Sequence, residues 1–157
     1  MELFYQETKE NYFDLHNGEY LILRDKDDNV VDVRCWNGQD HRFLKYGNFN
    51  SKWFGKFKPY DVYQKLVFDS LTNNKITMVK GPAGSGKSAI SLAFLMSELE
   101  RGNLDKIIVF CNTVATANSA KLGFYPGTRR EKLLDSQIGN MLSSKFGGRE
   151  GVEQLID

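Results

Sequence analysis

One short segment of this chain has the residue types and the spacing needed to bind phosphate. Residues 81–88, Gly-Pro-Ala-Gly-Ser-Gly-Lys-Ser, fill every fixed position of the pattern G-x-x-x-x-G-K-[ST]. Glycines let the backbone approach phosphate closely, and successive N–H groups of such a loop form an anion nest at the start of the following helix. The segment therefore predicts a nucleoside triphosphate site.

Two side chains at the end of this segment have distinct expected roles. Lys87 would bring its ammonium group to the β- and γ-phosphate oxygens. The Ser88 hydroxyl would ligate a Mg²⁺ ion that bridges the same two phosphates. We predict Lys87 and Ser88 as the catalytic residues, with Ser88 as the metal ligand, because a glycine-rich turn that binds nothing needs no Lys-Ser at its end.

The flanking segments have the order that such a loop requires. Residues 75–80 are a β-branched run typical of a buried parallel strand, and residues 89–99 have the apolar face of a helix. A second strand-like run follows at residues 106–111. The order strand, helix, strand predicts a parallel sheet, with the loop at the carboxyl end of its first strand.

The first 57 residues differ from the rest. Residues 19–24 and 29–36 look like two strands joined by a turn, which predicts a β-hairpin, and residues 41–46 predict a third strand. We therefore expect a small β-rich appendage at residues 1–57, followed by a nucleotide-binding domain at residues 58–157.

Composition narrows the class of protein but not its function. The 41% hydrophobic and 26% charged content is ordinary for a soluble globular protein, and a net charge of +1 gives no overall attraction to nucleic acid or membrane. No apolar run is long enough for a secretory signal or a membrane span, so we expect a cytoplasmic protein with no membrane partner. Cys35 and Cys111 are expected to be reduced thiols.

A stretch rich in lysine and aromatic residues, 49–59, precedes the predicted nucleotide-binding domain. Its rings could stack on the bases of single-stranded RNA while its lysines neutralise phosphates. The other interpretation is a linker whose rings pack on the core and whose lysines stay in water. The sequence favours the linker, because aromatic side chains usually bury and three lysines are few.

A helix is predicted to follow this stretch, from Pro59 to about Leu71. Its apolar positions recur at helical spacing, and the proline suits a first helical turn. Gln64 lies on this helix. Its amide could both donate and accept hydrogen bonds at the edge of an adenine base.

Together these residues resemble a known family. Gln64, residues 81–88, and the later run Leu-Gly-Phe-Tyr-Pro-Gly at 122–127 followed by Glu-Lys-Leu at 131–133 are similar to the PhoH-like ATPases, especially their phage-encoded members. The resemblance spans roughly residues 59–146. It implies a P-loop fold related to superfamily-one helicases, binding of ATP with Mg²⁺, ATP hydrolysis and a link to RNA handling.

The resemblance also completes the expected fold and site. The fold class is α/β, with part of a P-loop NTPase parallel sheet preceded by a small antiparallel β appendage. Gln64 becomes the expected adenine reader. The expected nucleotide-binding residues are Gln64, Pro82, Ala83, Gly84, Ser85, Gly86, Lys87, Ser88 and Ala89.

Two departures from the family pattern affect the expected activity. Residues 112–114 are Asn-Thr-Val where the family often has Thr-Arg-Pro. The family also has a later strand ending in Asp-Glu, whose acids hold Mg²⁺ through water and orient the attacking water; here the nearest pattern is Val152–Glu153, which is too short. The chain is expected to correspond to the front half of such an ATPase, able to bind ATP but poor at turnover.

Two other functions stay open at this point. A non-hydrolysing adenine-nucleotide-binding module would fit the missing acidic strand. A nucleotide or metabolite kinase would share the loop and add an arginine-bearing lid, to which Arg129 and Arg130 could belong. In a ring-shaped homo-oligomer Arg129, Arg130 or Lys132 could instead reach a neighbour's γ-phosphate, although a solvated basic turn is the simpler interpretation.

Overall fold

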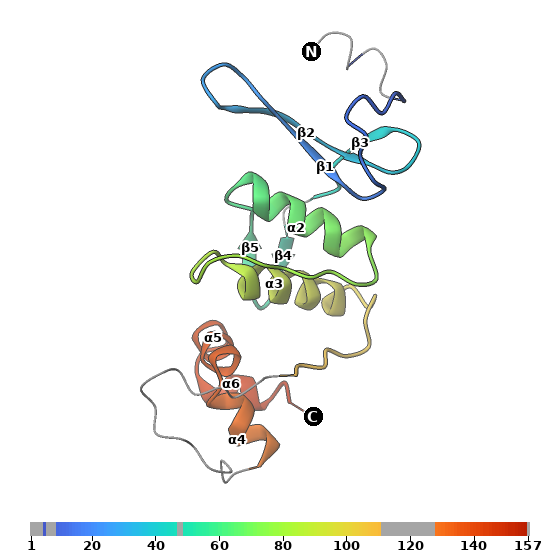
Figure 1. Ribbon diagram of the computed structural model, residues 1–157. Helices are drawn as coiled ribbons and strands as arrows, with labels where there is room; N and C mark the ends of the chain where they lie inside the picture. The colour runs from blue at the N-terminus through green and yellow to red at the C-terminus, as the bar shows by residue number, and fades with distance from the viewer. Residues whose placement is uncertain (1–4, 6–8, 47–48, 111–127, 157) are drawn as a thin grey trace, which may run out of the picture. The chain divides into compact units, whose positions relative to one another are not determined.

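The computed structural model describes residue 5 and residues 9–46, 49–110 and 128–156. The chain divides into two compact units: Met1–Asn48 with Lys58–Ile90, and Phe49–Phe57 with Ser91–Asp157. Figure 1 labels the helices and strands. They are β1 (Tyr20–Arg24), β2 (Val30–Trp36), β3 (His41–Phe43), β4 (Phe49–Ser51), β5 (Gly55–Phe57), α2 (Val62–Asn73), α3 (Lys87–Glu100), α4 (Arg129–Leu134), α5 (Gln137–Lys145) and α6 (Arg149–Glu153).

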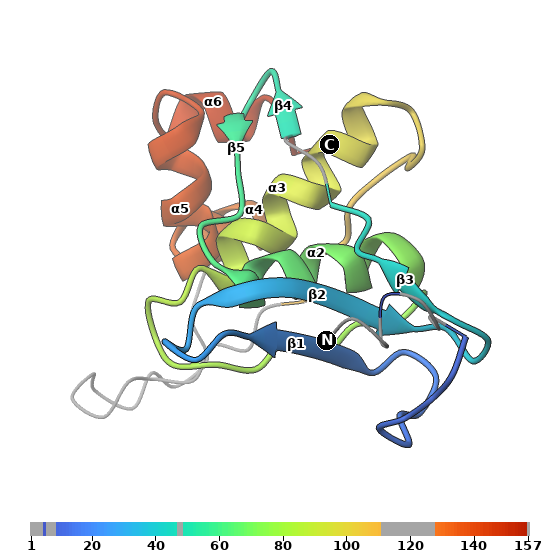
Figure 2. The same cartoon turned by 90° about the horizontal axis from the view of Figure 1, so that it is seen from above.

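β1, β2 and β3 form an antiparallel sheet with the strands in sequence order (Figure 2). Tyr20 lies opposite Cys35 in the first pair of strands, and Cys35 lies opposite Arg42 in the second. The predicted hairpin and third strand are therefore confirmed, with the third strand shorter than expected. Cys35 and Trp36 are neighbours at the end of β2, so they point to opposite faces of the sheet, and both are buried.

The carboxylate of Asp69 joins α2 to this sheet. It is fully buried and accepts two hydrogen bonds of 2.8 Å from the Arg42 guanidinium, one of 2.9 Å from the Tyr20 hydroxyl and one of 2.5 Å from the Lys45 N–H. Four donors satisfy the acceptor capacity of one carboxylate. The helix and the sheet are thus connected through one buried, fully hydrogen-bonded charge.

The start of α2 differs from the sequence prediction. The helix was expected to begin at Pro59, but it begins at Val62, because Asp61 is its N-cap and accepts the N–H of Gln64 at 2.7 Å. An aspartate at the N-cap satisfies a backbone donor that a helix start leaves without a partner. Pro59 therefore lies before the helix, not in its first turn.

The two predicted parallel strands are not strands among the described residues. Residues 75–80 and residues 106–110 do not form strands, and in the described part of the chain no strand pairs with either segment. An extended segment becomes a strand only through the hydrogen-bond ladder to a neighbour. A parallel sheet is therefore not shown here, and the architecture shown is mixed α/β with small antiparallel sheets.

β4 and β5 form a second antiparallel pair, within the stretch expected to be a linker. Three residues connect the strands, and Gly55 after them has φ +68°, in the left-handed region. A short loop followed by a residue in the left-handed region is a common hairpin connection. The Ser51 hydroxyl strengthens the turn by accepting the N–H groups of Trp53 and Phe54 at 3.0 and 2.9 Å.

α3 matches the predicted helix and buries Ile90, Ala93 and Met96 at helical spacing. α4 and α5 are separate helices, because the Ser136 hydroxyl accepts the Gly139 N–H at 3.0 Å and caps a new helix start. Among the described segments, none of the helices combines the length and the apolar character needed to cross a membrane.

We expect Asp69→Asn to destabilise the protein by roughly 3–5 kcal/mol, because breaking one partner of a buried ion pair leaves the other charge uncompensated. The measurement is the free energy of unfolding in urea. Asp28→Asn is the matched control, since Asp28 pairs with Arg24 at 3.3 Å but is 85% exposed; it should cost less than about 1 kcal/mol. Equal effects of the two substitutions would contradict the assignment.

The pH dependence gives a second expected outcome. Burial by itself raises the pKa of the Asp69 carboxyl, but the hydrogen bonds from Arg42, Lys45 and Tyr20 and the charge of Arg42 together lower this pKa below its ordinary value. A lowered folded-state pKa means that the ionised group stabilises the fold above about pH 4 and that this contribution is lost as pH falls through the folded-state pKa. The free energy of unfolding should therefore fall less steeply below pH 4 in Asp69→Asn than in the parent protein.

Candidate functional site

The glycine-rich loop turns sharply and leads directly into α3. Gly84 and Gly86 have φ values of +79° and +81°, in the region where a side chain causes strain. α3 begins at Lys87, and the Ile90 N–H donates to the Gly86 carbonyl at 2.9 Å. The first N–H groups of α3 have no partner inside the helix, and they come directly after the loop. An anion bound at the loop would lie close to them.

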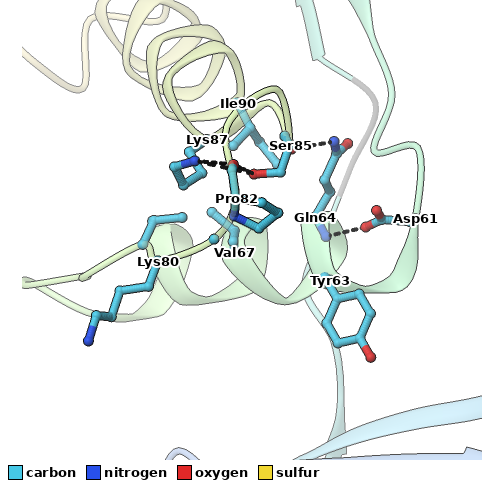
Figure 3. Close-up of a pocket in the computed structure, with 11 residues that line it drawn as sticks. Asp61, Tyr63, Gln64, Val67, Lys80, Pro82, Ser85, Lys87 and Ile90 are labelled. Atoms are coloured by element: carbon cyan, nitrogen blue, oxygen red, sulfur yellow. Dashed lines mark hydrogen bonds between the residues drawn. The ribbon is translucent and has the colours of Figure 1, made fainter. Parts of the chain in front are cut away.

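The side chain of Lys87 folds back over this loop. Its Nζ donates to the Pro82 carbonyl at 2.6 Å and lies 3.4 Å from the Ser85 hydroxyl (Figure 3). Both partners are neutral oxygens. Because a hydrogen bond from an ammonium to a charged oxygen is the stronger kind, an incoming phosphate could displace the carbonyl.

Gln64 connects the start of α2 to the loop. Its Oε1 accepts the Tyr60 N–H at 2.8 Å, and its Nε2 donates to the Ser85 carbonyl at 3.3 Å. A Cβ added at Gly86 would lie 3.0 Å from the same Nε2, closer than real Cβ contacts normally are. The left-handed φ of Gly86, together with this close approach, makes a residue without a side chain suitable at position 86.

A pocket of about 380 Å³ lies between the first turns of α2 and the loop. Its volume is within the range of small-molecule sites. The two lysines that line the pocket point in different directions. The Lys87 ammonium lies over the loop, whereas the Lys80 ammonium points away from the loop (Figure 3). The lining residues are Asp61, Tyr63, Gln64, Val67, Val79, Lys80, Gly81, Pro82, Ser85, Lys87 and Ile90.

The pocket contains only part of the predicted site. Of the predicted nucleotide-binding residues, Gln64, Pro82, Ser85 and Lys87 line it. The remaining ones border it along the loop and the first turn of α3, and Ser88 is exposed there. These remaining residues are Ala83, Gly84, Gly86, Ser88 and Ala89.

Several other predicted features lie elsewhere. Residues 112–114 and 122–127, which contributed to the family resemblance, lie outside the described residues. Arg130 is exposed on α4, a short helix that Thr128 and Glu131 start with a capping box. In the described part of the chain, no group of three or more His, Cys, Asp or Glu is arranged to hold a metal ion.

Sequence reasoning missed the contribution of Asp61 to this site. Asp61 caps α2 and positions Gln64, which is the third residue after it. The spacing Asp-x-x-Gln before an apolar run is a helix-start signature that was present in the sequence. The apolar wall of Val67, Val79 and Ile90 had no such signal, since those residues come from three separate segments.

We expect Gln64→Ala to speed hydrogen exchange at the Tyr60 amide about two- to tenfold, since one hydrogen bond contributes roughly 0.5–1.5 kcal/mol. Amide exchange followed by NMR or mass spectrometry measures this. Gln39→Ala, at an exposed glutamine between β2 and β3, is the control and should leave residue 60 unchanged. An unaltered exchange rate in Gln64→Ala would show that the bridge does not form in solution.

Comparison with known proteins assigns this region to a family. A family model described as PhoH-like protein matches residues 56–148, which is more than half of the chain. No solved structure matches the chain.

Curated relatives agree with that match. PhoH-like proteins of Mycobacterium leprae and Mycobacterium tuberculosis are each 33% identical over 76 residues, covering 48% of this chain and 21% of the relative. A protein named PhoH2 from Thermobispora bispora is 41% identical over 73 residues, covering 45% of this chain and 16% of the relative. The matched region thus spans about a fifth or less of each of these relatives.

Proposed function

This chain belongs to the PhoH-like protein family, which is generally a family of P-loop ATPases, and we propose that it binds Mg·ATP in the pocket between α2 and the loop before α3. The observation that carries the proposal is that Lys87 and Gln64, from two separate elements, converge on carbonyl oxygens of the same loop. A cation and an amide at one loop are the groups that a nucleotide needs at its two ends.

The phosphates would be bound by the loop and by Lys87. On binding, the ammonium would leave the Pro82 carbonyl for the β- and γ-phosphate oxygens, and the loop N–H groups would donate to the same oxygens. α3 has no acidic residue in its first turn, so its positive end is not neutralised there.

The base would be read by Gln64. Its amide now holds the Tyr60 N–H and the Ser85 carbonyl, so binding would exchange both partners for the adenine edge, with Oε1 accepting from the 6-amino group and Nε2 donating to N7. Guanine has an acceptor in place of that amino group. The exchange therefore favours adenine over guanine.

The residues present fit a Mg²⁺ ion. The loop curves through two left-handed glycines, and the exposed Ser88 hydroxyl follows Lys87 directly. Ser88 would be the protein ligand, because Mg²⁺ usually combines one or two protein oxygens with phosphates and water. When bound, the ion would neutralise charge on the β- and γ-phosphates.

We also propose that residues 75–80 and 106–111 are strands of a P-loop parallel sheet, within a nucleotide-binding domain at residues 58–157 that follows the appendage at residues 1–57. Ile76 and Met78 are exposed while Thr77 and Val79 are partly buried, which is the alternation of an extended strand. Val79 also lines the pocket just before the loop begins. A strand that leads into the loop would place the two in this way.

The proposal includes a coupling of nucleotide binding to RNA handling and to self-assembly. The exposed Arg130 on α4 supports self-assembly, because an arginine of one copy could reach the γ-phosphate bound by another copy. RNA handling is supported by the hairpin of β4 and β5, which carries lysines and aromatic residues.

We expect Lys87→Ala to weaken Mg·ATP binding about 10- to 150-fold, because a hydrogen bond to a charged group contributes roughly 1.5–3 kcal/mol. Isothermal titration calorimetry measures the change. Lys75→Ala, at an exposed lysine that does not line the pocket, is the matched control and should bind as the parent protein does. If both variants kept the parent affinity, the assignment of the site would be wrong.

We expect the 157-residue chain to bind ATP without rapid turnover, because the sequence shows no apolar strand ending in an acid. The nearest such pattern, Val152–Glu153, belongs to α6 and is helical. Phosphate release under steady-state conditions tests this, with binding confirmed in the same samples. Rapid release that disappears in Lys87→Ala would contradict the expectation and show that another acid completes the site.

A further inference from the structure

We propose that the β4–β5 hairpin binds a single strand of nucleic acid, with the indole of Trp53 stacking on an unpaired base. The inference rests on the part of the proposed function that couples nucleotide binding to RNA, and it gives that coupling a location. The surface is made by the hairpin loop and by the end of α5, within one compact unit of the chain.

The ring of Trp53 is both supported and accessible. Its centroid lies 5.3 Å from that of Phe146 with the planes inclined by 37°, while 44% of the residue remains exposed. Phe54 packs edge-on against the Phe146 ring, with centroids 6.2 Å apart and planes at 82°. An indole that already packs against a neighbouring ring and is still partly exposed loses little side-chain freedom when a base stacks on it.

The hairpin that carries Trp53 is fixed in place by Glu100 at the end of α3. The carboxylate accepts a 2.5 Å hydrogen bond from the Ser51 hydroxyl and a 2.8 Å bond from the Lys52 N–H. Burial raises the pKa of Glu100 but these bonds lower it more, so the net shift is downward and the group stays ionised. A rigid loop presents its aromatic ring without an ordering cost at the moment of binding.

Three exposed lysines belong to the hairpin and to α5, the elements that carry the two stacked rings, and the Glu100 carboxylate lies against the same loop. Lys52 and Lys56 are exposed on the hairpin, and Lys145 is exposed directly before Phe146, the residue that supports the indole. Figure 2 shows β4 and β5 together with α5 and α6. Lysines beside an open aromatic face are the combination that binds a phosphate backbone while its bases stack.

The chemistry favours a single strand over a duplex. Stacking on an indole needs a base face that is free, and a duplex offers none along its length. Because the chain as a whole carries a net charge of only +1, the attraction must come from this local surface and should be sensitive to salt.

The test measures binding of fluorescein-labelled oligouridine and oligothymidine, each about twelve nucleotides long, to the full chain by fluorescence anisotropy. Trp53→Ala should weaken binding of the single strand roughly 5- to 100-fold, whereas Trp53→Phe should keep most of it because the ring is retained. The two oligonucleotides distinguish RNA from DNA as the preferred strand.

Two matched controls separate the hairpin from general effects. Phe43→Ala removes an aromatic residue that is 68% exposed on β3, and Lys26→Gln removes an exposed lysine between β1 and β2. Both should leave strand affinity unchanged. Lys52→Gln should instead reduce the dependence of log K on log salt by about 0.7, as the loss of one phosphate contact to a single strand does.

Mg·ATP binding is measured on every variant, since Trp53 does not line the nucleotide pocket and its loss should leave that binding intact. Retained ATP binding in Trp53→Ala shows that the unit with the pocket is folded, and strand binding by Trp53→Phe shows that the unit with the hairpin tolerates a substitution at position 53. The proposal is overturned if the parent chain binds ATP but no single strand, if it prefers a duplex of equal length, or if Trp53→Ala and Phe43→Ala bind the strand alike. A strand-binding chain that fails to bind ATP would overturn the proposed nucleotide site and leave this surface standing.

Discussion

The buried Asp69 carboxylate is the interaction on which the arrangement around the pocket depends. A charge with no exposed surface is tolerated only when its hydrogen bonds are complete, and Arg42, Tyr20 and Lys45 complete them from the sheet and the segment after it. Since Asp69 belongs to α2, the same bonds hold the helix whose first turn carries Gln64. A contact that is purely structural thereby sets the position of a proposed ligand-binding group.

α2 works as a support between two parts of its unit. Toward the sheet it presents Asp69, and toward the segment that leads into the loop it presents Ser70, whose hydroxyl lies 3.1 Å from that of Thr77. Its N-terminal end contacts the loop itself through Gln64 and Ser85. The loop is thus held by hydrogen bonds to a neighbouring helix, while its own glycines allow the curvature.

Two polar side chains at the loop, Lys87 and Gln64, already have hydrogen-bond partners within the protein. Lys87 bonds to a loop carbonyl and Gln64 bonds to a carbonyl and an N–H, so neither is left without a partner. Any ligand must therefore offer better partners than the ones it displaces. Phosphate satisfies that condition for an ammonium, and an adenine edge offers one donor and one acceptor in exchange for those that the amide gives up.

Much of the local structure could be predicted from the sequence, because local structure depends on neighbouring residues. The alternation in residues 19–36 predicted the first hairpin, and the glycine, lysine and serine spacing of residues 81–88 predicted a loop that leads into a helix. The same spacing predicted that Lys87 would act at the loop, and its ammonium group does lie over the loop. The predicted start of α2 was less accurate, since Asp61 decides it through a single hydrogen bond that apolar periodicity does not register.

Only the tertiary structure decided which distant residues meet. Nothing in the sequence pairs Asp69 with Arg42, or Trp53 with Phe146, because the partners lie far apart along the chain and their types are common. The strands expected at residues 75–80 and 106–111 show the same limit. A β-branched run gives the tendency to form a strand, but hydrogen bonds to a neighbouring strand must complete it. The sequence by itself determined the residue types of the loop and the family to which the chain belongs, whereas the fold decided the contacts that hold the loop in place.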